Sequence, residues 1–307
     1  MPAVAYFVQQ IVNGLETGGV YALVALGYTL IYGILELLNF AHGDVYMVGA
    51  FLAGGVATLL VHNQVSAVPA VLVVGLMVLA ATLGAGVLGV GIERVAYRPL
   101  RNANRLAPLI TAIGVSLLLE SAVQVWVSPA PVLVPSNALV PQTVLQVSGV
   151  ETPLMGLMLL VVSVALMVGL DVFVYRTRFG SAMRATAQDR EAAAFMGIDI
   201  NRVIMVTFFV ASALAGLGGV LFGLRFATID FYMGYVLGFK AFTAAVVGGI
   251  GNVRGAMVGG LLLGVLESLA GGFISTQFQN TLVFLGLITV LMVRPQGLFG
   301  QPLTDRA

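Results

Sequence analysis

The sequence predicts an all-α protein whose helices cross a membrane as a polytopic bundle. Of the 307 residues, 59% are hydrophobic and only 9% are charged, and the mean hydropathy is +1.04. Soluble domains contain about 25% charged residues, so this composition is that of an integral membrane protein. Apolar runs of about 20 residues, the length that crosses the hydrocarbon core as a helix, recur along the whole chain.

Counting these runs predicts about eight to nine spans within a single transmembrane domain, residues 1–307. The long runs are 18–38, 45–61, 68–92, 106–127, 153–175, 203–224 and 255–275. Two further runs, 236–250 and 281–293, are short. The run 236–250 is rich in Gly and Ala, so a broken or re-entrant helix is an alternative there to a full crossing.

Positive charges orient the predicted helices, because Lys and Arg concentrate in short cytoplasmic loops. Nine of the 14 Lys and Arg residues fall in two loops. One loop has Arg94, Arg98, Arg101 and Arg105, and the other, over residues 176–202, has Arg176, Arg178, Arg184, Arg190 and Arg202. The segment 128–153 between them has several Pro and no Lys or Arg, so we expect it outside. A full crossing by 236–250 places Arg254 and Arg294 on the cytoplasmic side, and we favour it for that reason.

Three polar residues, Asn39, His42 and Asp44, stand together in LNFAHGDVYM between two apolar runs. A charged side chain at the bilayer centre costs about 2.5–3.5 kcal/mol, so such groups must face water, protein or the interface. One interpretation is a cytoplasmic turn in which Asn39 caps the second helix. The other is a helix interrupted within the membrane that lines a translocation path. One His and one Asp are too few ligands for a metal site.

The motif DVYM at residues 44–47 recurs as DFYM at residues 230–233, each shortly after a Phe-Ala pair. The predicted topology places the two copies on opposite membrane sides, which suggests an inverted repeat with interrupted helices. Chance, or Tyr residues in an interfacial belt, is the alternative. The candidate path residues are Asn39, Phe40, His42, Asp44 and Tyr46, with Phe242 and Thr243 in the segment 236–250.

Glu120 and Glu267 also fall within predicted spans. They indicate either interhelical hydrogen bonds or groups that couple transport to an ion, although an ion relay needs several such groups in line. Glycine-rich stretches such as GAGVLGVG and GAMVGGLLLG predict close packing between helices, because small residues let backbones approach.

Motifs for catalysis or nucleotide binding are missing. A P-loop requires Gly-Lys followed by Ser or Thr, and the single Lys of the chain, Lys240, lies between Phe239 and Ala241. The chain has no Cys, no H-E-x-x-H and no G-x-S-x-G, and its net charge of +1 without a basic tract gives no sign of a nucleic-acid partner. We expect a transport path without cofactor or metal, not an enzyme, driven by energy from another subunit.

In the second basic loop, REAAAFMGIDINRV predicts a short helix over 191–196 with Gly197 as its C-cap. A helix this short is not stable alone in water. It is either a docking element for a cytosolic partner or a solvated connector. The candidate coupling residues are Arg184, Asp189, Glu191, Ala192, Phe195 and Gly197.

Four stretches carry a family resemblance: GGVYALVALGYTLIYGILELLNFAHGDVYMVGAF, IERVAYRPLR, the Glu-Ala-Ala of residues 191–193 followed by Gly197, and GFKAFTAAVVGGIGNVRGAMVGGLLLG. Together they resemble the smaller, H-type permease subunit of bacterial ABC importers for branched-chain amino acids. The resemblance extends from about residue 12 to about residue 300.

The resemblance implies a multi-pass permease of the bacterial inner membrane, in contact with lipid, that imports Leu, Ile or Val. It implies four partners: a second homologous permease, two cytosolic ATPase subunits that hydrolyse ATP, and a periplasmic amino acid binding protein. Residues 176–202 would contact the ATPases, and 128–153 with 225–238 the binding protein. A permease for urea or short amides, and an ion-coupled secondary amino acid transporter, are the alternatives.

Overall fold

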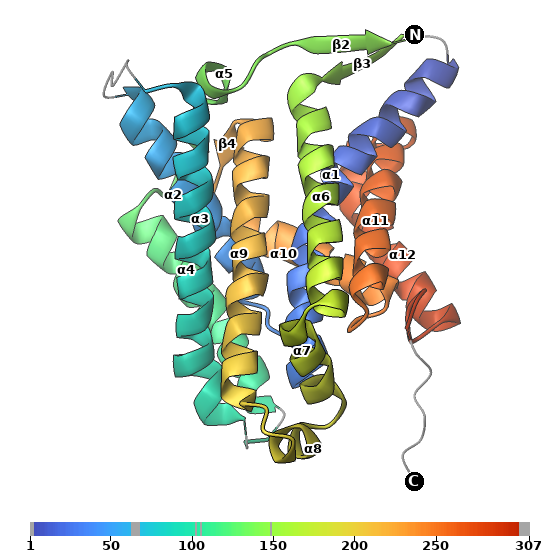
Figure 1. The fold of residues 1–307 in the computed structure, drawn as a ribbon. Helices are drawn as coiled ribbons and strands as arrows, with labels where there is room; N and C mark the ends of the chain where they lie inside the picture. Colours follow the sequence, from blue (N-terminus) through green and yellow to red (C-terminus); the bar gives the residue numbers. More distant parts are fainter. Residues whose placement is uncertain (1–2, 63–67, 102, 105, 148, 301–307) are drawn as a thin grey trace.

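The computed structural model describes residues 3–62, 68–101, 103–104, 106–147 and 149–300, and these residues form a bundle of α-helices (Figure 1). Within this part of the chain, 8 helices are long and apolar enough to cross a membrane. They are α1 (Ala3–Leu35), α2 (His42–His62), α3 (Ala70–Ile92), α4 (Leu106–Trp126), α6 (Leu154–Arg176), α9 (Ile200–Phe226), α11 (Val253–Phe273) and α12 (Gln279–Val293), the last together with the 3-10 turn that precedes it. The predicted polytopic bundle is therefore confirmed.

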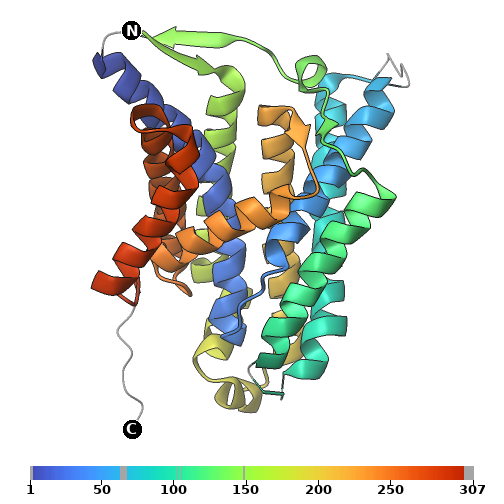
Figure 2. The same ribbon diagram turned by 180° about the vertical axis from the view of Figure 1, so that it is seen from behind.

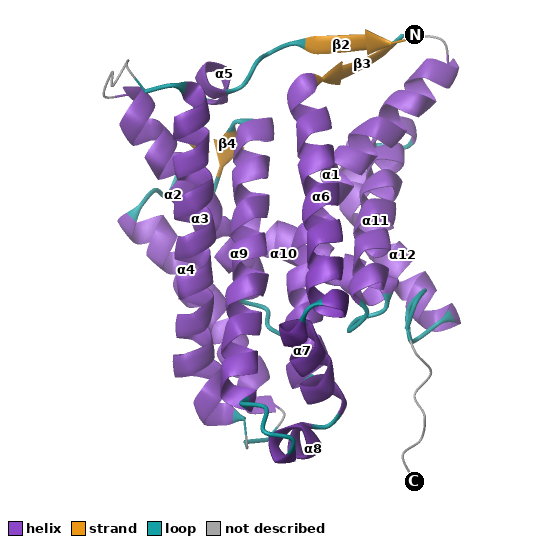
Figure 3. Ribbon diagram, viewed as in Figure 1, coloured by secondary structure: helices purple, strands orange, loops and turns teal. Residues whose placement is uncertain are grey.

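Shorter elements connect these spans. The helical ones are η1 (Glu93–Tyr97) and η2 (Arg98–Leu100), which prolong α3, then α5 (Ser136–Leu139), α7 (Arg178–Gln188), α8 (Arg190–Phe195), α10 (Met233–Gly248) and η3 (Thr276–Phe278). Two short antiparallel pairs join β1 (Val132–Leu133) to β4 (Thr228–Ile229) and β2 (Val144–Val147) to β3 (Val150–Pro153). Figure 3 shows how little strand the fold contains.

The two ends of the bundle differ in the way that the charge pattern predicts. The β2–β3 hairpin and α5 lie at one end, and α7 and α8 lie at the other, together with the basic residues that follow α3 (Figure 1). The chain enters α11 and leaves α12 on the side of α7, so Arg254 and Arg294 belong to the basic end. Arg105 lies outside the described residues.

The connection from α1 to α2 is an interruption inside the bundle. Glu36 takes a positive φ of 56° directly after α1, and residues 36–41 run back without helical structure into the middle of the bundle, where α2 begins at His42 (Figure 2). The interpretation as a simple turn at the cytoplasmic end is therefore wrong. The structure instead has the alternative arrangement, an interruption between two helices in the middle of the bundle.

A second interruption follows α9. Residues 227–232, which include β4, return toward the centre from the end of α9 opposite α7 and α8, and α10 begins there at Met233. DVYM and DFYM mark the starts of α2 and α10. The favoured prediction of a full crossing by a helix over 236–250 needs correction. The segment consists of the non-helical residues 227–232 followed by α10, an oblique helix of 16 residues that is about 24 Å long.

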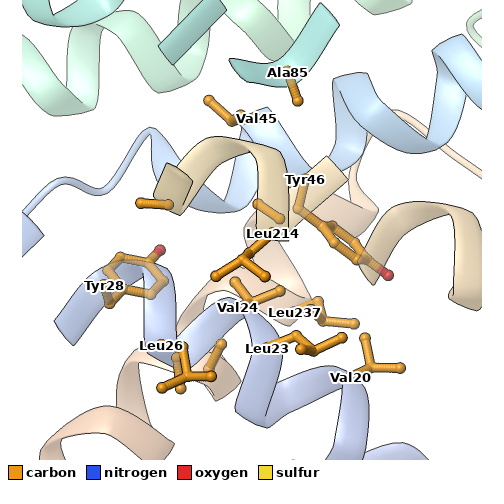
Figure 4. Close-up of a cluster of buried hydrophobic side chains, with 14 of the residues drawn as sticks. Val20, Leu23, Val24, Leu26, Tyr28, Val45, Tyr46, Ala85, Leu214 and Leu237 are labelled. Atoms are coloured by element: carbon orange, nitrogen blue, oxygen red, sulfur yellow. The ribbon is translucent and has the colours of Figure 1, made fainter. Parts of the chain in front are cut away.

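The contacts between helices repeat with inverted direction. α1 packs against α11 and α10, whereas α9 packs against α3 and α2. α1 and α9 run in opposite directions through the bundle (Figure 1). The units α1–α4 and α9–α12 therefore form an inverted repeat, as the recurrence of DVYM as DFYM predicts. The centre, where α1 meets α2, α9 and α10, is filled by apolar side chains such as Val24, Leu214 and Leu237 (Figure 4).

Glycines set the closest helix contacts. A Cβ built on Gly264 of α11 would lie 2.4 Å from the carbonyl oxygen of Gly14 and equally close to the backbone of Gly18, both on α1. At the meeting of the two interrupted helices, a Cβ on Gly43 would lie 2.4 Å from the carbonyl oxygen of Gly234. These contacts leave no room for a side chain, because backbone packs directly on backbone.

Replacing Gly264 by Ala should therefore destabilise the protein, although Ala is the better helix former by about 1 kcal/mol. Overpacking against rigid backbone costs about 1–3 kcal/mol, and we expect a melting temperature in detergent that is lower by about 3–8 °C. Gly286→Ala is the matched control, because a Cβ there meets nothing within 4 Å. Equal melting temperatures of the two variants would contradict this account of the α1–α11 contact.

Candidate translocation path

The polar cluster at the first interruption lies in the protein interior. Asn39, His42 and Asp44 are exposed by 3%, 0% and 1%. The hydroxyl of Tyr97 donates to Asn39 Oδ1 over 3.1 Å, and the hydroxyl of Ser116 on α4 donates to Asp44 Oδ2. Asn39 therefore accepts a bond from another helix instead of capping α2. Asn39 Oδ1 and Asp44 Oδ2 are therefore bonded to neighbouring helices rather than to bulk water.

Aromatic rings connect part of the predicted path. The ring of His42 packs edge-on against Tyr28, with centroids 5.0 Å apart, and Tyr28 contacts Phe242 at 6.0 Å. Phe40 contacts Phe242 at 5.7 Å and stacks on Phe239 at 5.9 Å. One region between α1, α2, α4 and α10 is therefore surrounded by four predicted residues. Phe40, His42 and Phe242 reach it through ring contacts, and Asp44 reaches it through its bond with Ser116.

Two other predicted residues, Tyr46 and Thr243, lie apart from this group. Tyr46 is fully buried and packs edge-on against Phe222 of α9, with ring centroids 6.1 Å apart (its ring is labelled in Figure 4). Thr243 donates to the carbonyl of Phe239 one turn earlier in α10, over 2.8 Å. Tyr46 thus contacts α9, and Thr243 bonds within its own helix. All seven residues remain predictions as path residues.

Two cavities flank α10. The α4-side cavity has a volume of about 190 Å³ and is lined by Tyr28, Phe40, Ile113, Ser116, Leu117, Glu120, Gly234, Tyr235, Gly238 and Phe239. The α9-side cavity has a volume of about 260 Å³ and is lined by Tyr21, Phe222, Asp230, Tyr232, Met233, Val236, Leu237 and Lys240. Each combines aromatic or aliphatic walls with a few polar groups, the usual composition of small-molecule sites.

An ion pair lies beside the α9-side cavity. Lys240 Nζ donates to Glu267 Oε1 over 2.7 Å, and the hydroxyl of Tyr21 donates to Glu267 Oε2 over 2.8 Å. Both charged residues are buried to 9% exposure. This cluster joins α10 to α11 and α1, and it satisfies both oxygens of a carboxylate that would otherwise be costly within the membrane.

The face of the bundle that carries α10 is not covered by another helix (Figure 2). Polar and charged groups lie along it, among them Glu120 of α4, Asp230 before α10 and Lys240 on α10. Tyr232 and Tyr235 on the same face are about half exposed. Charged groups within the membrane lie against protein or a water-filled cavity, not against lipid tails. This face therefore fits a protein partner or a water-filled path.

The coupling residues lie at the opposite end from the β2–β3 hairpin. The side chain of Asp189 accepts from the backbone N–H of Ala192 over 3.0 Å and caps α8. Gly197 follows α8 with φ of 82°, a conformation that favours Gly. Phe195 and Met196 are 90% and 82% exposed. The short helix and its glycine end are thus found where the sequence predicted them.

Helix α7, which the sequence did not predict, links this region to the bundle. The Arg184 guanidinium donates to the carbonyl of Val174 near the end of α6. Arg190, at the start of α8, donates to the carbonyl of Ile34 over 2.6 Å, one of the last carbonyls of α1. The coupling region is therefore attached to α1 close to the interruption at residues 36–41.

Several residues that surround the interior polar groups were not identified from the sequence. Ser116, Tyr28 and Tyr97 have no distinguishing pattern, because an isolated hydroxyl in an apolar run gives no signal of its partner. Lys240 could have been singled out, since it is the single Lys of the chain and lies within an apolar segment. Glu267 was noted, but its pairing with Lys240 needed the tertiary structure.

Comparison with known proteins decides the family. The family model described as "Branched-chain amino acid transport system / permease component" matches residues 10–293. The chain belongs to this family. The permease is 41% identical to the high-affinity branched-chain amino acid transport system permease protein BraD of Pseudomonas aeruginosa, with 100% of both chains covered. It is 40% identical to the corresponding protein LivH of Salmonella typhimurium, with 98% of both chains covered.

A more distant relative is the probable branched-chain amino acid transport permease protein LivH of Methanocaldococcus jannaschii. It is 27% identical over 91% of this permease and 88% of its own length. No solved structure matches the chain. Membership of the family is therefore shown by sequence similarity over nearly the whole chain.

The hydrogen bond from Ser116 to Asp44 yields a test of the interior polar cluster. Ser116→Ala leaves a buried carboxylate without that donor, and we expect a loss of about 1–3 kcal/mol in the free energy of unfolding. Ser163→Ala is the matched control, because Ser163 Oγ is buried without a hydrogen-bond partner among the described residues. Thermal unfolding in detergent measures both. If Ser116→Ala unfolded at the same temperature as Ser163→Ala, the bond would not stabilise the cluster.

Proposed function

We propose that the permease forms the translocation path of an ATP-driven importer of branched-chain amino acids, together with a second, homologous permease. The full-length similarity to two permease proteins of high-affinity branched-chain amino acid systems carries this proposal. In this proposal, two cytosolic ATPase subunits supply the energy and a periplasmic protein supplies Leu, Ile or Val. The permease provides the path and no chemistry, as a chain without a P-loop would.

The uncovered face of α10 supports the placement of the path and of the second permease. Glu120, Asp230 and Lys240 lie on this face, where contact with lipid is costly. A second permease that covers the face would enclose both cavities and give the charged groups a polar surrounding. Substrate would then pass along α10, with Phe40, Phe242 and Asp44 behind it.

The exposed apolar tip of α8 supports the contact with an ATPase. Phe195 and Met196 project into solvent at the basic end, outside the spanning helices. Large apolar side chains exposed together outside the membrane indicate a binding surface. Arg184, Asp189 and Glu191 would form the polar rim that surrounds such a surface.

The outer end supports a docking face for the binding protein. Val134 N–H donates to the carbonyl of Ala227 over 2.9 Å, next to the β1–β4 pairing, so the loop 128–153 lies against the segment that leads to α10. The side chain of Gln9 bonds the backbone of Glu151 through both its amide oxygen and its amide nitrogen, over 2.7 and 2.8 Å. These contacts hold β1 beside the second interruption and the β2–β3 hairpin beside the start of α1.

The ion-coupled alternative receives less support. A coupling carboxylate must exchange its ion, whereas Glu267 is held by Lys240 and Tyr21. Glu120 lines the α4-side cavity, whereas Glu267 bonds Lys240, which lines the cavity on the other side of α10. The two carboxylates therefore do not form a continuous relay across the membrane.

Reconstitution of the complex in liposomes tests the proposed function. We expect leucine uptake only when both permeases, the ATPases, ATP and the binding protein are present, and no uptake driven by a Na⁺ or proton gradient. Radiolabelled leucine and urea, supplied in parallel, measure transport and separate the substrate classes. Uptake by the permease alone under an ion gradient would contradict the proposal and favour a secondary transporter.

The tip of α8 can be tested separately. Removing both apolar side chains with Phe195→Ala and Met196→Ala should reduce recovery of the ATPase with the permease about tenfold or more, because buried interface anchors contribute about 2 kcal/mol or more. Gly197→Val should uncouple ATP hydrolysis from uptake, since a β-branched residue is strained at this φ. Both variants should still insert normally in the membrane.

Leu133→Ala is the control for this test, because Leu133 is also exposed, at 75%, but lies at the opposite end. Normal ATPase recovery with the double variant, and normal coupling with Gly197→Val, would show that α8 is only a connector.

A further inference from the structure

The α9-side cavity places opposite charges around a small apolar space. Asp230 and Lys240 both line it, one just before α10 and the other at the middle of α10. Side chains on a helix lean toward its N-terminus, so that of Lys240 leans in the direction of Asp230. At about 260 Å³ the cavity is slightly smaller than the pockets that hold drug-sized ligands, which begin at about 300 Å³.

The ammonium group of Lys240 retains capacity for a ligand. It has three donors, and Glu267 Oε1 takes one of them over 2.7 Å. Nζ also lies over the ring of Tyr21, 5.8 Å from the ring centroid. Tyr21 lines the cavity and fixes the second oxygen of Glu267. Glu267 therefore holds Lys240 in position and balances its charge, while a second anion can still approach the remaining donors.

Asp230 supplies a fixed negative group at the other side of the cavity. Its Oδ1 accepts from the backbone N–H of Tyr232 over 2.8 Å, which orients the carboxylate at the start of α10. A carboxylate has two oxygens with about four lone-pair sites in total, so an ammonium ligand can bind the same group. Glu267 balances the charge of Lys240, so Asp230 leaves the cavity with one negative charge when it is empty.

The remaining wall is apolar. Phe222 from α9 and Met233, Val236 and Leu237 from α10 surround the space between the two charged groups. A branched aliphatic side chain fits such a wall, because burial of each CH₂ contributes about 0.8 kcal/mol. An uncharged polar substrate such as urea would leave both the charges and the apolar wall without a complementary partner.

We propose that the α9-side cavity is a subsite for a zwitterionic amino acid, in which Lys240 binds the carboxylate, Asp230 the ammonium group, and Phe222, Val236 and Leu237 the aliphatic side chain. The proposal rests on the proposed function and adds the residues that select the substrate class. Glu267 is a positioning residue for Lys240 and does not contact the substrate.

Photo-labelling of the assembled transporter with a diazirine analogue of leucine tests the subsite. In the wild-type complex we expect label within residues 228–240, displaced by leucine but about tenfold less well by leucinamide, which lacks the carboxylate. Asp230→Asn should reduce this labelling about tenfold. The amide oxygen of Asn can still accept the bond from Tyr232, so the start of α10 keeps its structure.

A pair of variants separates substrate binding from the structural role of the ion pair. Lys240→Met alone would strand the charge of Glu267, so it is combined with Glu267→Gln in a double variant. The double variant should lose labelling about tenfold and no longer distinguish leucine from leucinamide. Glu267→Gln alone keeps Lys240 and should retain labelling within about threefold and retain that distinction. Asp171→Asn, which removes the exposed ion pair with Arg254, controls for loss of charge elsewhere.

Equal labelling of Glu267→Gln and the double variant would overturn the role of Lys240 and leave the ion pair as a structural contact. A wild-type complex that couples leucine uptake to ATP hydrolysis but takes no label within residues 228–240 would overturn the subsite while the proposed function stands. A wild-type complex without ATP-dependent leucine uptake would instead overturn the proposed function.

Discussion

The fold depends on satisfying the backbone groups that two interrupted helices expose within the membrane. A break in a spanning helix frees N–H and C=O groups, and lipid offers them no partner. Here distant side chains and strands provide partners: Arg190 bonds the carbonyl of Ile34, the hydroxyl of Tyr97 reaches the carbonyl of Leu38, and β4 pairs with β1. The breaks therefore lie inside the protein, surrounded by other helices, and this fixes which helices must surround them.

The close approach of the interrupted helices follows from the same constraint. The start of α2 meets α10 at Gly43, Gly234 and Gly238, where a Cβ would collide with backbone. Because the extended segments take up part of the crossing, α10 is short and oblique, and one of its faces stays uncovered. The two cavities and the charged groups along that face are consequences of this geometry. A break that costs backbone hydrogen bonds thus leaves a polar surface along α10, as interrupted helices do at the binding sites of transporters.

The two ends of the molecule are connected to the two breaks. At the basic end, Arg190 joins α8 to the end of α1, directly before the first break. At the outer end, the pairing of β1 with β4 joins the loop 128–153 to the second break. Partners that bind at either end would therefore act on segments whose backbone is not held by a continuous helix. Such segments change conformation at lower cost than the helices that surround them.

The sequence by itself determined the membrane class, the positions of the long spans, the two ends and the α8 element with its terminal Gly197. These features depend on the composition of short segments and on the Lys and Arg residues that flank the spans. Both can be read from the sequence without knowing which helices pack together. It also pointed to Asn39, His42 and Asp44 as unusual, but left open whether they formed a surface turn or an internal break. Only the tertiary structure decided this, because the partners that make a break stable, Tyr97, Ser116 and Arg190, come from other helices. The pairing of Lys240 with Glu267 was decided in the same way: a buried charge is tolerable only beside its partner, and the distance between the two is a property of the packed bundle.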